Sequence, residues 1–168
     1  MMEYTGSDGH PALTDPQTGL PNALHWDTFF EVIFASGQRG LPLTLLLLDI
    51  DDLQESLSRR GIQEADGLFG LLGETIKAKT RQSDLIARIG EERFAFLLLD
   101  CNLEGGRLVA DRLDLALEPL RDVSGLSFSM GAAGYDREMN SPQELVKAAE
   151  DALRTARSRG MNQMEIGI

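Results

Sequence analysis

The sequence is short of the residue types that would place it in several broad classes of protein. It has a single cysteine, Cys101, so an internal disulfide is excluded and a reducing compartment is favoured. It has 16 lysines and arginines against 27 acidic residues, and the resulting net charge of −11 argues against nucleic acid or an anionic membrane as a partner. This balance still allows a small anionic ligand held by a local group of arginines.

Long apolar runs are also missing. The longest, LPLTLLLLDI at 41–50, is about half as long as a membrane-spanning helix needs to be, and it ends in acidic residues. The first 14 residues are polar and lack the apolar segment of a signal peptide. We therefore expect a cytoplasmic domain with no membrane contact in this segment. Residues 1–11 would be a disordered arm or an expression boundary, and residues 12–168 would be one domain.

Apolar periodicity predicts an alternating order of helices and strands. The expected helices cover 21–40, 52–60, 62–80, about 104–118 and 141–156. The expected strands are a buried run at 43–50, a hairpin over 87–100, an alternating strand at 126–136 and a closing strand at 163–168. The predicted fold class is α/β, in the form of an α+β sandwich with about five strands in a central sheet flanked by helices.

Individual helices carry more specific signals. In the first helix Leu24, Phe29 and Val32 are near helical spacing, which marks an apolar side. In the helix at 104–118, Leu108 is expected on the same side as the apolar residues that follow it. The last helix has the clearest start, because Ser141 is followed by proline and, at the third helical position, by glutamate, which together predict a capping box.

Acidic residues gather where the buried strand 43–50 ends. Strand alternation places Asp49 and Asp51 on one face, about 7 Å apart. One or two carboxylates together with substrate phosphates are a common Mg²⁺ site, whereas an acidic strand end facing water is the alternative. If the hairpin packs beside this strand, Glu91 or Glu92 at its tip would supply a further carboxylate. The charged tip itself is either a solvated turn or the remains of a metal site.

Five segments, taken together and in this order, resemble the landmarks of the GGDEF domain family, the bacterial diguanylate cyclases and their degenerate relatives. They are DPQTGLPN (15–22), DIDDLQESLSRRGIQEAD (49–66), RQSDLIARIGEERF (81–94), SMGAAGYD (129–136) and AEDALRTARSRGMN (149–162). The resemblance implies a palm-like sheet surrounded by helices, as in nucleotide cyclases. It also implies a reaction in which two domains each hold one GTP with divalent metal. The 3′-hydroxyl of each GTP then attacks the α-phosphate of the other to give cyclic di-GMP.

The resemblance assigns family roles to six positions of the chain. Asp49, the carbonyl of Ile50 and Glu92 match metal ligands, and Glu92 is also the candidate catalytic acid. The nucleotide-binding positions are Asp66, which matches the acid that reads guanine, Gly90, which matches the first glycine of the signature, and Arg157, which keeps the charge of a phosphate-contacting lysine. Mg²⁺ is the expected cofactor only if this nucleotide site is functional.

Other positions depart from the family pattern. Glu91 stands where the second glycine lets the backbone approach the phosphates, and each like-charge pair at about 4 Å costs roughly 4 kcal/mol at an effective dielectric near 20. Arg93 replaces the second acid of the signature, and Leu57 replaces the asparagine that hydrogen-bonds guanine. The further replacements are Gln54 for a lysine and Ala23 and Met161 for arginines. These changes predict an inactive cyclase with a degenerate signature.

The chain keeps the residues of a second family site, the inhibitory site. Arg81 and Asp84 match the Arg-x-x-Asp of the inhibitory site that binds cyclic di-GMP, and Arg112 matches a second arginine of that site. We therefore expect a cyclic di-GMP receptor that passes its signal to a partner or an attached domain. The expected assembly is a homodimer or a link to a sensory or effector domain. The alternatives are an active cyclase that uses GTP and a protein-interaction module that binds no nucleotide.

Overall fold

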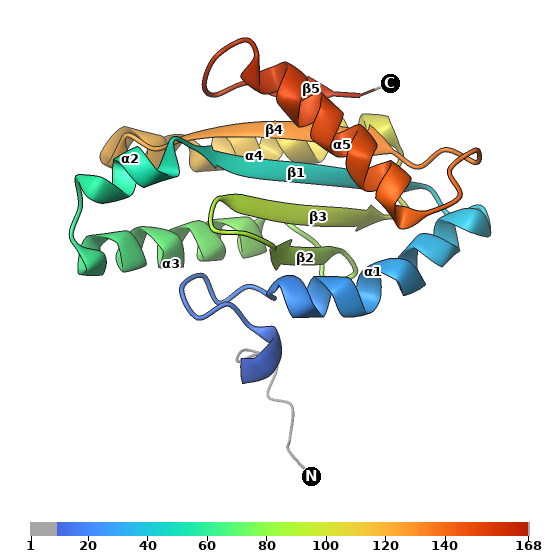
Figure 1. Ribbon diagram of the computed structural model, residues 1–168, viewed down its shortest axis with the longest axis horizontal. Coiled ribbons are helices and arrows are strands. Elements are labelled where there is room, and N and C mark those ends of the chain that lie inside the picture. Colours follow the sequence, from blue (N-terminus) through green and yellow to red (C-terminus); the bar gives the residue numbers. More distant parts are fainter. Residues whose placement is uncertain (1–9, 168) are drawn as a thin grey trace.

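The computed structural model describes residues 10–167, which contain a five-stranded sheet covered by helices on both faces (Figure 1). The strand order is β2-β3-β1-β4-β5; all neighbours are antiparallel except β4 and β5, which are parallel. The strands are β1 (Leu43–Asp51), β2 (Leu85–Arg88), β3 (Arg93–Leu99), β4 (Ser127–Gly134) and β5 (Met164–Ile166). The predicted α+β class is confirmed.

The described residues contain five α-helices, four of which divide between the two faces of the sheet. They are α1 (Ala23–Gln38), α2 (Leu53–Ser58), α3 (Ile62–Ala78), α4 (Leu103–Ser124) and α5 (Pro142–Arg157). The side chains of α3 and α4 share one apolar cluster with the sheet, and those of α1 and α5 share the other. The short helix α2 follows β1 at one end of the sheet (Figure 1). Within residues 10–167, no helix is long and apolar enough to cross a membrane.

The central strand β1 is buried along its whole length because both of its faces are covered by helices. Leu46 and Leu48 belong to the cluster with α3 and α4, and Leu45 and Leu47 belong to the cluster with α1 and α5. Two-sided burial accounts for the continuous apolar run in the sequence, in place of the alternation of a half-exposed strand. Near its end the same strand places two acidic residues, Asp49 and Asp51, in the interior.

The structure corrects the predictions for two of the helices. In α1 the buried side is formed by Trp26, Phe30 and Phe34, whereas Leu24 and Val32 are exposed. Helix α4 is longer than expected and ends at a glycine in the left-handed conformation, which is a common helix stop, and Leu108 on it is exposed. Residues 1–9 of the expected disordered arm lie outside the described residues, and its end, from Pro11, begins a short 3₁₀ helix, η1 (Pro11–Leu13).

Candidate functional site

The buried carboxylate of Asp49 lies at the centre of a network of charged side chains. Asp49 is completely buried on β1, and strand pairing places Arg93 of β3 directly opposite. Arg93 donates from Nε to Oδ1 at 2.8 Å and from Nη2 to Oδ2 at 3.1 Å, while Nη1 of Arg157 lies 2.9 Å from Oδ2. The hydrogen bond to Asp49 raises the pKa of Arg93, so the guanidinium stays charged. Two arginines therefore neutralise one buried carboxylate.

The second buried acid of β1, Asp51, also has hydrogen-bond partners within the fold. Asp51 accepts hydrogen bonds from the hydroxyls of Ser127 and Ser129, both at 2.9 Å, and from the backbone N–H of Asn162 at 3.0 Å. Nε of Arg157 lies 3.8 Å from Oδ1 of Asp51. The expectation that Asp49 and Asp51 share one face is consistent with Arg157 reaching both. These contacts make Asp51 a structural anchor for the chain around Asn162.

The residues at this end of the sheet do not fit a divalent cation. Among residues 10–167 no three histidine, cysteine or acidic side chains come together in a way that could hold a metal ion. The tip of the hairpin does pack beside β1, because the N–H of Ile50 donates to the carbonyl of Glu92 at 2.8 Å. However, Glu92 lines a cleft of about 430 Å³, whereas the oxygens of Asp49 face guanidinium groups. A cation at Asp49 would have to displace Arg93 or Arg157.

A hydrogen bond links helix α2 to the hairpin tip. Nε2 of Gln54 donates to the carboxylate of Glu91 at 2.8 Å. Glu91 lines one cleft, of about 240 Å³, and Gln54 lines the neighbouring cleft that Glu92 also borders. The resemblance assigns the position of Glu91 to a glycine that leaves room for phosphates. In this chain the Glu91 side chain occupies that position, and its hydrogen bond to Gln54 connects the hairpin to α2. Gly90 precedes it in the hairpin tip.

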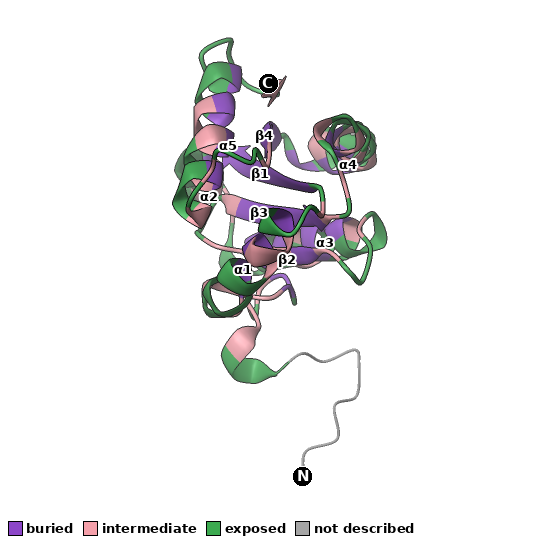
Figure 2. Cartoon of the chain, turned by 90° about the vertical axis from the view of Figure 1, so that its right-hand side faces the viewer, coloured by how far each residue is buried: buried purple, intermediate pink, exposed green. Residues whose placement is uncertain are grey.

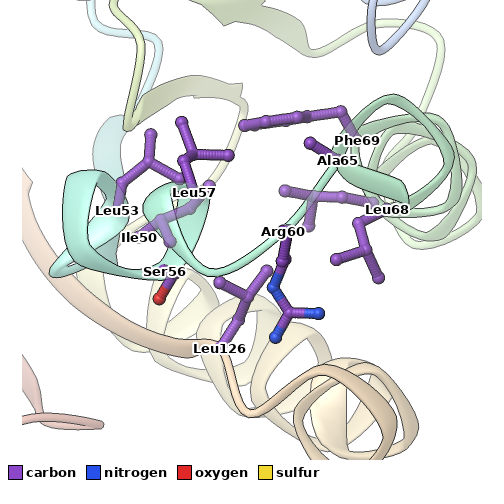
Figure 3. Close-up of a pocket in the computed structure, with 10 residues that line it drawn as sticks. Ile50, Leu53, Ser56, Leu57, Arg60, Ala65, Leu68, Phe69 and Leu126 are labelled. Atoms are coloured by element: carbon purple, nitrogen blue, oxygen red, sulfur yellow. The ribbon is translucent and has the colours of Figure 1, made fainter. Parts of the chain in front are cut away.

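The cleft beside α3 contains Asp66, and Leu57 makes part of its wall apolar where the resemblance implies an asparagine. Asp66 accepts a hydrogen bond from Nε2 of Gln17 at 2.9 Å. Figure 3 shows the adjoining pocket, in which Leu57 of α2 and Phe69 of α3 form apolar walls and the Arg60 side chain lies nearby. Leu57 offers no polar atom to a base. The cleft therefore keeps Asp66 as an acceptor and lacks the asparagine that the family pattern places at position 57.

Sequence reasoning missed Arg88, which ties several segments together. Its guanidinium donates to Asp15 at 3.2 Å, to Gln17 at 2.6 Å and to the carbonyl of Glu91 at 2.7 Å, and it lies 4.2 Å from the ring centroid of Phe69. The available signal was an arginine at the end of an otherwise apolar strand, directly before the hairpin tip. Arg88 thereby holds the loop after η1 against the hairpin.

The Arg81–Asp84 segment is ordered and keeps its arginine accessible. Nη2 of Arg81 donates to Asp84 at 3.1 Å and to the carbonyl of Leu99 at 2.6 Å. Asp84 is buried and also accepts from the N–H of Leu99 at 3.2 Å, whereas the Arg81 side chain is 56% exposed. The hydrogen bond to Asp84 raises the pKa of Arg81. The guanidinium is thus held in one orientation at the surface.

A cleft of about 390 Å³ adjoins Arg81, and most of its polar lining was not predicted. It includes Lys77 of α3 and Gln82, with His25 contributed by α1, and burial lowers the pKa of His25. Arg112 lies on the exposed side of α4 and forms no ion pair within the described part of the chain. Cys101 is half-buried, and burial raises the pKa of its thiol, as expected for an unreactive cysteine.

Comparison with known proteins agrees with this arrangement. The family described as "Diguanylate cyclase, GGDEF domain" matches residues 12–163. Diguanylate cyclase DgcP of Pseudomonas aeruginosa is 33% identical over 166 residues, covering 92% of this chain and 24% of that protein. The uncharacterized protein YhcK of Bacillus subtilis is 31% identical, covering 88% of this chain and 43% of that protein. The chain therefore spans less than half the length of these relatives.

Solved structures show the same fold. The GGDEF domain of DgcB from Caulobacter crescentus, in complex with c-di-GMP, superposes with a TM-score of 0.80 at 22% identity, covering 93% of this chain and 96% of that one. The active GGEEF domain of a diguanylate cyclase from Vibrio cholerae gives a TM-score of 0.80 at 18% identity, covering 88% and 97%. With the family match over most of its length, the chain belongs to the GGDEF domain family.

Proposed function

We propose that this GGDEF domain does not convert GTP to cyclic di-GMP and instead binds cyclic di-GMP through Arg81 and Asp84. One observation carries the loss of catalysis: the buried carboxylate of Asp49 is already neutralised by Arg93 and Arg157. Phosphoryl transfer of this kind depends on metal to neutralise charge on the phosphates. Glu91 adds a further negative charge where the phosphates would approach.

The geometry of Arg81 supports the binding half of the proposal. A guanidinium that is half-exposed and already oriented loses little conformational freedom when it pairs with a phosphate or a guanine edge. Lys77 and Gln82 in the adjoining cleft supply further donors for an anionic ligand. Arg112 would be the second arginine of the site, as the family pattern implies. We expect the domain to work in the bacterial cytoplasm and to pass the signal to an attached domain or a partner.

Replacing Arg81 with alanine is expected to weaken cyclic di-GMP binding by about 10–100-fold, the loss of one or two charge-assisted hydrogen bonds. Calorimetric titration of wild type and variant measures this, with wild type binding at micromolar concentrations. Arg154→Ala is the matched control, since Arg154 is an exposed arginine of α5 whose one ion pair among residues 10–167 is with Asp151. Absence of wild-type binding, or equal affinity of Arg81→Ala, would contradict the receptor proposal.

Incubation with GTP and Mg²⁺ or Mn²⁺ tests the loss of catalysis. We expect no cyclic di-GMP, with the active GGEEF domain from Vibrio cholerae as the positive control. Formation of product that depends on Asp49 would overturn the proposal. A thermal transition unchanged by both GTP and cyclic di-GMP would instead favour a protein-interaction module that binds no nucleotide.

A further inference from the structure

Helix α4 presents a row of exposed apolar side chains on the side away from the sheet. Leu108, Leu115 and Val123 are 61%, 68% and 76% exposed. Their spacing places them within about 80° of one another around the helix. The opposite side of α4 is buried against the sheet, so the exposed row is not part of the core. Figure 2 looks nearly along α4 and shows exposed residues on the turns of this helix.

An acidic edge runs beside this apolar row. Four exposed carboxylates share a strip of about 40° along roughly 27 Å of the helix: Glu104, Asp111, Glu118 and Asp122. Two exposed cations accompany these residues: Arg112 lies within the angular range of the apolar row, and Arg107 borders the acidic strip on its far side. We call the three apolar residues and the four carboxylates the α4 face. It combines apolar anchors with a single predominant charge, which is the pattern of a surface that selects its partner by charge.

We propose that the α4 face docks a basic amphipathic helix of a partner protein. The apolar side of such a helix would cover Leu108, Leu115 and Val123, and its lysines or arginines would meet the acidic edge. A second copy of this chain fits less well, because a two-fold axis between antiparallel helices would set Glu118 and the other acids against their own counterparts. This inference goes beyond the proposed cyclic di-GMP site, which lies on the Arg81–Asp84 segment and has only Arg112 on α4.

Fluorescence anisotropy with a labelled lysine–leucine helical peptide of about five turns tests the α4 face. We expect wild type to bind this peptide, and a variant with Leu108, Leu115 and Val123 changed to serine to bind at least about tenfold more weakly. The three side chains are exposed, so the variant should fold, which circular dichroism checks. The matched control changes Leu24 and Val32 of α1, also exposed, to serine and should bind like wild type.

Charge variants separate this inference from the proposed function. Asp111→Lys with Glu118→Lys should weaken peptide binding, whereas Arg112→Ala should strengthen it by removing a like charge. The same Arg112→Ala change would weaken cyclic di-GMP binding if the proposed function is correct, so the two proposals fail separately. Equal binding of a sequence-scrambled or glutamate–leucine peptide, or an equal loss in the α1 control, would overturn the inference. So would a dimer in sedimentation that Leu115→Ser abolishes.

Discussion

Replacing Arg93 with alanine is expected to lower the free energy of unfolding by about 2–4 kcal/mol. Asp49 is completely buried, and Arg93 makes two hydrogen bonds to it, so within the described residues the variant leaves this carboxylate with Arg157 as its one charged partner. The Arg93 side chain is 28% exposed, which places the expected loss below that of a fully enclosed ion pair. Urea denaturation at neutral pH measures the difference.

The contact of Arg93 with Glu150 provides the control for this result. That pair is 3.3 Å apart and the Glu150 side chain is 40% exposed, so Glu150→Ala should cost less than about 0.5 kcal/mol. A double-mutant cycle between Asp49→Ala and Arg93→Ala should give a coupling energy of at least about 1 kcal/mol. If Arg93→Ala and Glu150→Ala cost the same, the buried pair with Asp49 is not the source of the stability.

The elements with strong local signals were predictable from the sequence. The nine-residue strand β1 reads as a continuous apolar run because it is covered on both faces. Helix α5 begins where its capping box predicts, and the carboxylate of Glu144 accepts from the N–H of Ser141 at 3.0 Å. The buried side of α1 was not predictable, since apolar residues surround this helix and contact with the sheet decides which of them are buried.

The candidate site was predictable in position more than in chemistry. The resemblance placed Asp49 near Glu92 and the hairpin tip, and the structure brings these segments together. The resemblance could not show that the Arg93 side chain points toward the carboxylate of Asp49. An arginine in place of an acid at the start of a strand could equally well extend into water. Arg157 reaches Asp49 from a helix far along the chain, and such tertiary contacts leave no local pattern. The position of Arg88 at the end of an apolar strand marked the residue, but its partners Asp15 and Gln17 are also tertiary contacts.

The chemistry of the site predicts how it responds to charge and metal. Replacing Arg93 with glutamate would set a second carboxylate opposite Asp49, and at about 4 Å this like-charge pair costs roughly 4 kcal/mol at an effective dielectric near 20. The variant should therefore unfold at a lower temperature than Arg93→Ala when a chelator is present. Millimolar Mg²⁺ should recover part of the loss by binding between the carboxylates. Thermal denaturation with and without Mg²⁺ measures both effects.

Arg93→Gln separates the added carboxylate from the lost guanidinium in this experiment. It removes the same ion pair without adding a negative charge, so it should be destabilised but should not respond to Mg²⁺. Wild type should not respond either, because Arg93 and Arg157 already neutralise Asp49. A rise in the wild-type midpoint as large as that of Arg93→Glu would show that a cation competes successfully with the two guanidinium groups. The site would then be a working metal site, and the case for a catalytically inactive domain would fail with it.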